Sequence, residues 1–334
     1  MRVAVLRGMA RAPIDVLRDA VAAAVMAPSS HNTQPWRFRI DGATLDLFAD
    51  PARRLHVIDP ECRQQVQSCG CALYNARVAV RAMGWRDEVT VMLVDSDQPH
   101  HLATLHLGEL HIPDELDHMR IEAIGNRHTN RRAFERVPVP PDDVEALIAE
   151  AACEGATLVR LDPDQKTALG QLVDEADRQH LAHPGYRAEL ERWLATPGSL
   201  RRDGIPFVEK EYGSALPFTV HHAVEAPGFA RRFAELERQL VTDAPIVAVL
   251  GTPGDEPADW LASGQALEAV LLRATALGLS AAFLDQVLEI SELRARVASL
   301  VPGIGYPQMV VRIGLAAEPI RRAAPRRSVA DVLD

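Results

Sequence analysis

Apolar residues recur every three or four positions after Pro13, which predicts a helix because residues at that spacing share one helix face. Two short apolar strands then flank Asp41-Gly42, a dipeptide typical of tight hairpins. A long helix follows, with an apolar stripe from Val66 to Met83 and a stop at Gly84. The first unit comprises a helix over residues 13–27, strands over 36–40 and 44–49, a helix over 62–84, and strands over 88–94 and 102–107.

A second unit of similar order begins near Arg127. Pro140-Pro141-Asp142-Asp143 predicts a helix start, because proline and acidic residues are favoured in a first turn. Buried strands and another long helix follow. The second unit comprises a helix through Val144 to Ala151, strands over 156–161 and 245–250, a helix over 260–279, and strands over 281–284 and 308–315.

The two long helices resemble one another without a gap. Five positions match, including Gly70 with Gly264 and Gly84 with Gly278. A glycine inside a helix costs about 1 kcal/mol and usually marks close packing, so these matches indicate a duplication. Chance similarity stays open, because helices share alanine and leucine anyway. The aligned segments are SCGCALYNARVAVRAMGW (68–85) and ASGQALEAVLLRATALGL (262–279).

The pattern divides the chain into halves at residues 1–120 and 121–334, in accord with a length of 334 residues that suits about two domains. A long, mostly polar helical insertion occupies residues 164–242 of the second half. Its aromatic stretch 186–193, followed by RRDGIPF, is typical either of a flap over a ligand or of a peripheral helical cap.

A net charge of −10 argues against a nucleic-acid or anionic-membrane surface and favours a small-molecule ligand. No apolar run approaches the roughly 20 residues that span a bilayer, and we expect a cytoplasmic protein. The histidine-rich stretch 100–118 lacks carboxylates at ligand spacing, so we expect no metal site. The cysteines lack paired spacing and are expected to be buried small hydrophobes: Cys62, Cys69, Cys71 and Cys153.

Two polar stretches carry the candidate chemistry. APSSHNTQPW (27–36) leaves the first helix through hydroxyl, amide and proline residues, which is typical of a ligand cradle or of an ordinary loop. RHTNRRAF (127–134) gathers arginines whose forked donors match phosphate oxygens, although such a run is also typical of a solvated surface.

Each half keeps one of these stretches. Where the first half has Pro28-Ser29-Ser30, the second has Ala156-Thr157-Leu158. Other site classes lack their motifs: there is no GxGxxG after a strand, no GxxxxGK[ST] and no GxSxG.

Together the stretches resemble the flavin-dependent nitroreductase family, and the single-chain duplicated layout resembles its Acg-type branch. The loop is similar to the family's Pro-Ser-Ser-x-Asn-x-Gln-Pro-Trp, RHTNR to its Arg-x-Ser-x-Arg entry, and PRRSV to its C-terminus. The resemblance implies an α+β fold with mixed, largely antiparallel sheets packed with helices. It also implies FMN between two tandem halves that form an intramolecular pseudo-dimer, with further pairing of whole chains left open.

The resemblance assigns cofactor-binding roles by position and names no catalytic residue. The phosphate and ribityl chain would be held from the second half and the C-terminus. The polar edge of the ring would be bound from the first-half loop, and backbone N–H groups would face the reactive ring nitrogen. The phosphate and ribityl chain would be bound by Arg127, His128, Thr129, Arg131 and Arg326. The polar edge of the ring would be bound by Ser29, Ser30 and Asn32, with Gln34 supporting the loop. The backbone N–H groups would be those of Leu284, Asp285 and Gln286. Gln286 departs from the glycine often found there.

The activity implied is hydride transfer from NAD(P)H through FMN to nitroaromatic or quinone-like acceptors. An alternative is a protein that binds or sequesters FMN with little or no NAD(P)H turnover. A third is an interaction module whose sites have decayed.

Overall fold

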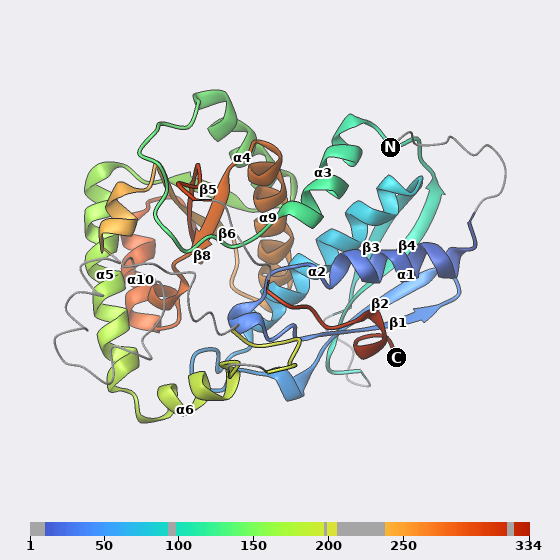
Figure 1. Cartoon of the computed structure of the whole chain (residues 1–334), viewed down its shortest axis with the longest axis horizontal. Coiled ribbons are helices and arrows are strands. Elements are labelled where there is room, and N and C mark those ends of the chain that lie inside the picture. The colour runs from blue at the N-terminus through green and yellow to red at the C-terminus, as the bar shows by residue number, and fades with distance from the viewer. Residues whose placement is uncertain (1–10, 93–97, 197–198, 206–237, 319–323) are drawn as a thin grey trace.

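The computed structural model describes residues 11–92, 98–196, 199–205, 238–318 and 324–334. Figure 1 shows two sheet-bearing halves side by side, with two long helices between them. Among the described residues, no helix is both long and apolar enough to cross a membrane.

Each half contains a four-stranded antiparallel sheet, and the two sheets have the same strand order. The first runs β1-β2-β4-β3 and the second β5-β6-β8-β7, so in each half a helix connects the second strand to an edge strand. The predicted α+β class is confirmed. The strands are β1 (Trp36–Asp41), β2 (Thr44–Ala49), β3 (Trp85–Val91), β4 (His101–Leu110), β5 (Thr157–Arg160), β6 (Ile246–Thr252), β7 (Ser280–Phe283) and β8 (Tyr306–Gly314).

Two 20-residue helices, α2 (Arg63–Ala82) and α9 (Pro257–Ala276), cross at the centre of the molecule (Figure 1). A Cβ on Gly70 would lie 2.3 Å from the Leu261 carbonyl oxygen, and one on Gly264 would lie 2.1 Å from that of Gln67. Gln67 and Leu261 occupy equivalent positions in the sequence alignment of the two helices. The contact is therefore reciprocal, as at a two-fold axis.

Helix α2 differs from the amphipathic helix that its apolar stripe predicts. It is buried on every face, including polar side chains such as Gln64, Gln67 and Asn75. The reason is its position, since α9 covers the side that would otherwise face water. Its buried amides find partners across the crossing: Gln67 Nε2 donates to Ser263 Oγ at 3.1 Å.

The halves differ most after their first helices. Helix α1 (Pro13–Ala24), shorter than predicted, is followed by residues 25–35 before β1. Helix α4 (Pro141–Cys153) is followed only by residues 154–156 before β5. The second half therefore has no loop corresponding to the polar loop of the first.

The insertion begins with α5 (Pro163–Ala182) and α6 (Pro184–Trp193), as its polar helical pattern predicts. Tyr186 and Trp193 are buried in an apolar cluster with Leu55 and Ile58 of the first half. These aromatic residues dock the insertion onto the first half. Residues 197–198 and 206–237 of the predicted insertion, which include the last two residues of RRDGIPF, lie outside the described residues.

Two helices have no counterpart in the predicted pattern: α3 (Glu115–Asn126) and α10 (Ser291–Leu300). Few of their residues are buried, so their apolar periodicity is weak. The cysteine prediction holds for Cys69 and Cys71, which are buried, but is wrong for Cys153. Cys153 is exposed because it ends α4, beyond the apolar face that α4 turns toward the core.

The C-terminal segment crosses from the second half to the first and lies along β1 (Figure 1). Phe38 N donates to the Val332 carbonyl at 2.7 Å, and Asp334 N donates to that of Phe38 at 2.8 Å. The end of the chain thus adds backbone pairing to the first sheet.

Gly264→Ala is expected to lower the free energy of unfolding by about 2–3 kcal/mol, because the added methyl group overlaps the Gln67 backbone and must push α2 from α9. Denaturant titration would measure this change. The control is Gly125→Ala in α3, where an added Cβ meets nothing within 4 Å. Equal stability for Gly264→Ala and Gly125→Ala would contradict the close crossing.

Candidate functional site

The polar loop after α1 has a strained backbone. His31, Asn32 and Gln34 have φ values of 51°, 53° and 50°, in the left-handed region that side chains disfavour. Such backbone conformations persist only where surrounding contacts hold them in place, and they cluster at functional sites. The contacts around the loop supply this constraint.

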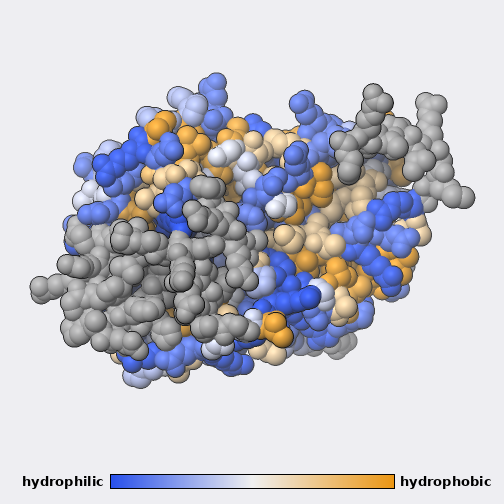
Figure 2. Space-filling model, viewed as in Figure 1, coloured by the Kyte–Doolittle hydropathy of each residue, from blue (hydrophilic) through white to orange (hydrophobic). Residues whose placement is uncertain are grey.

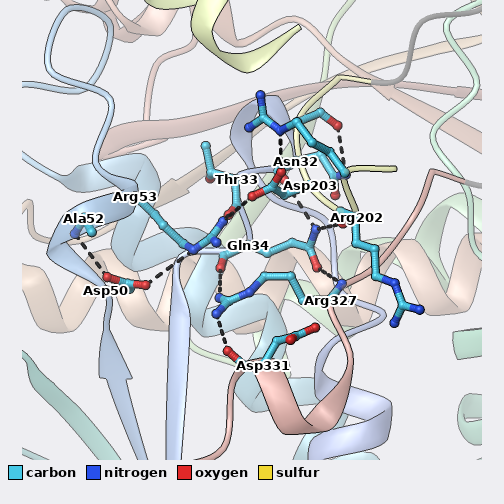
Figure 3. Close-up of polar contacts among 12 residues, drawn as sticks. Asn32, Thr33, Gln34, Asp50, Ala52, Arg53, Arg202, Asp203, Arg327 and Asp331 are labelled. Carbon is cyan, nitrogen blue, oxygen red and sulfur yellow. Dashed lines mark hydrogen bonds and ion pairs between the residues drawn. The ribbon is translucent and has the colours of Figure 1, made fainter. Parts of the chain in front are cut away.

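Gln34 is fully buried and joins three segments of the chain (Figure 3). Its Nε2 donates to the Arg202 carbonyl at 2.7 Å, and its Oε1 accepts from Arg327 N at 2.8 Å. Its own N–H donates to Ser29 Oγ at 2.9 Å. One amide therefore ties the loop to the insertion and to the C-terminal segment.

Asn32 is held from the same two sides. Its Nδ2 donates to the carbonyl oxygens of Gly204 at 2.9 Å and Pro325 at 3.2 Å, and its Oδ1 accepts from Arg326 at 3.2 Å. Gly204 N returns a bond to the Asn32 carbonyl at 3.0 Å. The sequence predicts Asn32 as a contact of the flavin ring, but both ends of its side chain are engaged in shaping the loop.

An ion pair braces the insertion beside the loop (Figure 3). Arg53 donates to Asp203 Oδ2 at 2.7 Å and to the Thr33 carbonyl at 2.9 Å. Arg201 donates to the other Asp203 oxygen at 2.9 Å. Burial favours a raised pKa for Asp203, but the hydrogen bonds from Arg53 and Arg201 hold that pKa below its ordinary value.

Ser30 connects the loop to a buried carboxyl of the second half. Its hydroxyl donates to Gln64 Oε1 at 2.6 Å, and Gln64 Nε2 donates to Glu289 Oε1 at 3.0 Å. Burial raises the pKa of Glu289 to about 8. His180 on α5 lies 3.3 Å from the other Glu289 oxygen.

The arginine-rich stretch lies along the edge strand β7. Asn130 N donates to the Ala281 carbonyl at 2.8 Å, and Thr129 forms a parallel bridge with Ala281. Arg312 donates to the Arg131 carbonyl at 3.0 Å. Because residues 284–286 follow β7 directly, the structure places the two predicted second-half segments side by side.

Arg127 and Arg326 meet at the start of the polar loop. Both donate to the Met26 carbonyl, at 3.2 Å and 3.3 Å, although they lie far apart in sequence. Among the described residues, the buried Nε atom of each guanidinium group has no hydrogen-bond partner. Arg127 Nε faces the Glu268 carboxylate at 3.4 Å, whereas Arg326 Nε is left over. Two neighbouring guanidinium groups of this kind form a site suited to an anion.

The pKa shifts agree with an accumulation of positive charge. Burial and the neighbouring Arg127 lower the pKa of Arg326 to about 10. Burial, Arg127 and Arg326 also lower the pKa of His128. On the loop, burial, Arg131 and His180 lower the pKa of His31 to about 4. The arginines of the second half therefore gather around the loop, and burial together with Arg131 keeps its His31 neutral near pH 7.

The segment after β7 differs in one respect from its predicted role. Leu284 N donates to the Val310 carbonyl at 2.9 Å, so this N–H is already bonded and cannot serve a ring nitrogen. Asp285 and Gln286 begin a short 3-10 turn (Asp285–Leu288), whose first N–H groups have no partner within the turn. Burial raises the pKa of Asp285 to about 7, against the opposing effect of Arg63.

Several residues that shape the site were absent from the sequence prediction. Glu268 had a detectable signal, since it is the lone acidic residue in an apolar helical run. The others were not detectable, because polar residues on helices and loops are usually solvated. They are Arg53, Gln64, Asp203 and Glu289. Among the described residues, no group of three or more His, Cys, Asp or Glu side chains is placed to hold a metal ion.

Asp203→Asn is expected to destabilise the protein by about 1–3 kcal/mol at neutral pH, because it weakens charge-assisted bonds to Arg53 and Arg201. Since the folded pKa of Asp203 is depressed, its stabilisation is complete above the ordinary value of about 4 and disappears as pH falls through the folded pKa. Thermal unfolding of the wild type and of Asp203→Asn from pH 7 to pH 3 would show whether their difference in stability becomes smaller as the pH falls.

Asp174→Asn is the matched control, because its carboxylate pairs with the exposed Arg178 at 3.5 Å, a contact expected to add little stability. A pH-independent difference between Asp203→Asn and the wild type would contradict the ion-pair explanation.

Comparison with known proteins agrees with this arrangement. The model of the Nitroreductase family matches residues 124–315, which include the arginine stretch and the second sheet. The Mycobacterium tuberculosis H37Rv protein named "Putative NAD(P)H nitroreductase Rv3131" is 34% identical over 327 residues, covering 96% of this chain and 91% of its own. "Putative NAD(P)H nitroreductase acg" of the same strain is 32% identical over 323 residues and covers 95% of each chain.

Among solved structures, the FMN and NADPH-dependent nitroreductase NfnB from sphigopyxis sp. strain HMH is 20% identical, with a TM-score of 0.40. The match covers 64% of this chain and 97% of NfnB. The assignment rests on the sequence comparisons: a family match over more than half of the chain and relatives above 30% identity along nearly its whole length. The chain belongs to the nitroreductase family, and its resemblance to the Acg-type proteins is confirmed.

Proposed function

We propose that this chain is an NAD(P)H-dependent FMN oxidoreductase of the nitroreductase type, which holds one flavin between its two halves. One observation supports this proposal above all: Arg127 and Arg326 converge on the Met26 carbonyl at the start of the strained loop, and the buried Arg326 Nε has no hydrogen-bond partner among the described residues. The names of the relatives and of NfnB support the nicotinamide and the cofactor.

The cation cluster would bind the FMN phosphate. Arg127, His128, Thr129 and Arg131 would hold the phosphate and ribityl chain, and Arg326 would close the site from the C-terminal segment. A phosphate dianion would relieve the mutual repulsion that lowers the pKa of Arg326. The chemistry of the donor set therefore fits the cofactor.

The strained loop would bind the polar edge of the ring. Ser29 Oγ accepts a hydrogen bond from Gln34, so its O–H remains available as a donor. The Ser30 O–H is used in a hydrogen bond to Gln64, so its oxygen remains available as an acceptor. Asn32 and Gln34 would fix the loop, and the N–H groups of Asp285 and Gln286 would face the reactive edge.

Bound FMN would supply hydride transfer, taking a hydride from NAD(P)H and passing electrons to a nitroaromatic or quinone-like acceptor. The chain's own residues would orient the cofactor and exclude water. Prearranged N–H donors stabilise negative charge without reorganisation, which is the contribution expected of residues 285–286.

The matched topology of residues 1–120 and 121–334 supports a tandem duplication that acts as an intramolecular pseudo-dimer. The place equivalent to the polar loop is occupied differently, since Glu154, directly after α4, forms an ion pair with Arg77 at 2.6 Å. Arg77 also pairs with Asp87 at 2.8 Å. We therefore expect one flavin per chain.

Arg127→Ala is expected to weaken FMN binding about 10- to 100-fold, because it removes charge-assisted bonds worth about 1.5–3 kcal/mol to the phosphate. Riboflavin, which lacks the phosphate, should be affected less. Fluorescence titration of flavin-free protein gives both affinities. Arg136→Ala, at an exposed pair with Asp243, is the control. Unchanged FMN affinity in Arg127→Ala would contradict the proposal that Arg127 binds the phosphate.

Anaerobic NADPH or NADH is expected to bleach the yellow holoprotein, and a nitroaromatic compound should restore the colour. Absorbance near the flavin maximum follows both steps, and the same sample gives flavin per chain. Failure to bleach with either nicotinamide would favour FMN binding without turnover, and two flavins per chain would contradict the single site.

A further inference from the structure

Glu268 is a fully buried carboxylate beneath the proposed phosphate site. It lies on α9 with none of its surface exposed, and its Oε1 is 3.4 Å from Arg127 Nε. Among the described residues, neither Glu268 oxygen accepts a hydrogen bond of good geometry. An ionised carboxylate with so little compensation is costly to bury, so its protonation state responds to neighbouring charge.

The groups that face Glu268 come from three other segments. Arg127 follows α3, Arg326 lies on the C-terminal segment, and Asn75 and Cys71 lie on α2. Burial raises the pKa of Glu268 to about 7, while Arg127, the Asn75 amide and Arg326 act in the opposite direction. Burial and Glu268 together raise the pKa of Cys71, so this thiol stays neutral near pH 7.

Glu268 is confined to the half that carries the arginine stretch. In the alignment of the two long helices, it stands where the first helix has Tyr74. The carboxylate therefore accompanies Arg127 and is no general feature of the two helices.

We propose that Glu268 is a positioning residue of the phosphate site: its carboxylate balances and orients Arg127 in the free protein, and it takes up a proton when a phosphate dianion binds. This inference rests on the proposed FMN site. A dianion and the Glu268 carboxylate would share one guanidinium group, and adjacent negative charges in a buried setting cannot all stay ionised. A solvent proton then joins a carboxylate oxygen and leaves a neutral carboxyl group.

The other titratable groups of the cluster gain or lose protons at pH values away from pH 7.5–8. His128 would also gain proton affinity from a dianion, but its pKa starts below the ordinary value. Arg326, with a pKa of about 10, remains charged near pH 8, and the second pKa of a phosphate monoester is about 6. Proton uptake between about pH 7.5 and 8 therefore reports mainly on Glu268.

The test is calorimetric titration of FMN into the flavin-free full chain at about pH 7.5–8, in buffers with different ionisation enthalpies. We expect uptake approaching one proton per FMN and little uptake with riboflavin. FMN affinity should fall by up to about tenfold per pH unit above pH 7, and should level off below it, where Glu268 is already neutral.

Glu268→Gln should bind FMN without this proton uptake and with a flatter pH dependence. The control is Glu150→Gln, which should keep the uptake because it changes a buried carboxylate of α4 that pairs with Arg120, away from the proposed phosphate site.

Equal proton uptake in the wild type and Glu268→Gln would overturn the inference, as would wild-type binding without uptake or equal uptake with FMN and riboflavin. These last two outcomes need no variant, so they decide the matter even if Glu268→Gln fails to fold. Failure of the wild-type chain to bind FMN at all would instead overturn the proposed function.

Discussion

At the crossing of α2 and α9, backbone lies directly against backbone, because Gly70 and Gly264 carry no side chains to separate the helices. This contact sets the distance between the two halves. Gln64 near the start of α2 can then reach Glu289 of the second half. The site depends on the crossing, since each half supplies only part of the polar groups.

The polar loop shows how the rest of the chain maintains a strained conformation. Three of its residues have positive φ, a backbone conformation that costs energy and persists only where surrounding contacts hold it. Partners for Asn32 and Gln34 come from the insertion near Gly204 and from the C-terminal segment near Arg327. The insertion is thus part of the loop's support, and its buried aromatic residues anchor it there. Figure 2 shows hydrophilic and hydrophobic residues interspersed over the described surface in this view.

The central polar groups share a second constraint, which is burial of charge. Arg127 and Glu268 are buried, and loss of water also raises the pKa values of the half-buried Asp285 and Glu289. Compensation for these charges comes from one another and from nearby amides. Such an arrangement costs stability in an isolated fold. Its location between loop, arginine stretch and C-terminal segment is the physical argument that it serves a ligand.

Local pattern was sufficient for much of the fold. Apolar periodicity and turn residues predicted the hairpin at Asp41-Gly42, both long helices and most strands, because these elements depend on neighbours in sequence. Gly70 and Gly264 were recognisable as packing positions because a glycine inside a helix is costly and usually marks close packing. Helices with few buried residues, α3 and α10, had too weak a pattern to be predicted.

The sequence by itself determined which residue types were available: a loop of small polar side chains, a run of arginines and one acid in an apolar helix. Only the tertiary structure decided what they touch. Asn32 became a support of the loop, Leu284 N–H was bonded to Val310, and Arg326 was brought beside Arg127. Hydrogen bonds and charge interactions act over a few ångströms in space, and separation along the chain does not predict that distance.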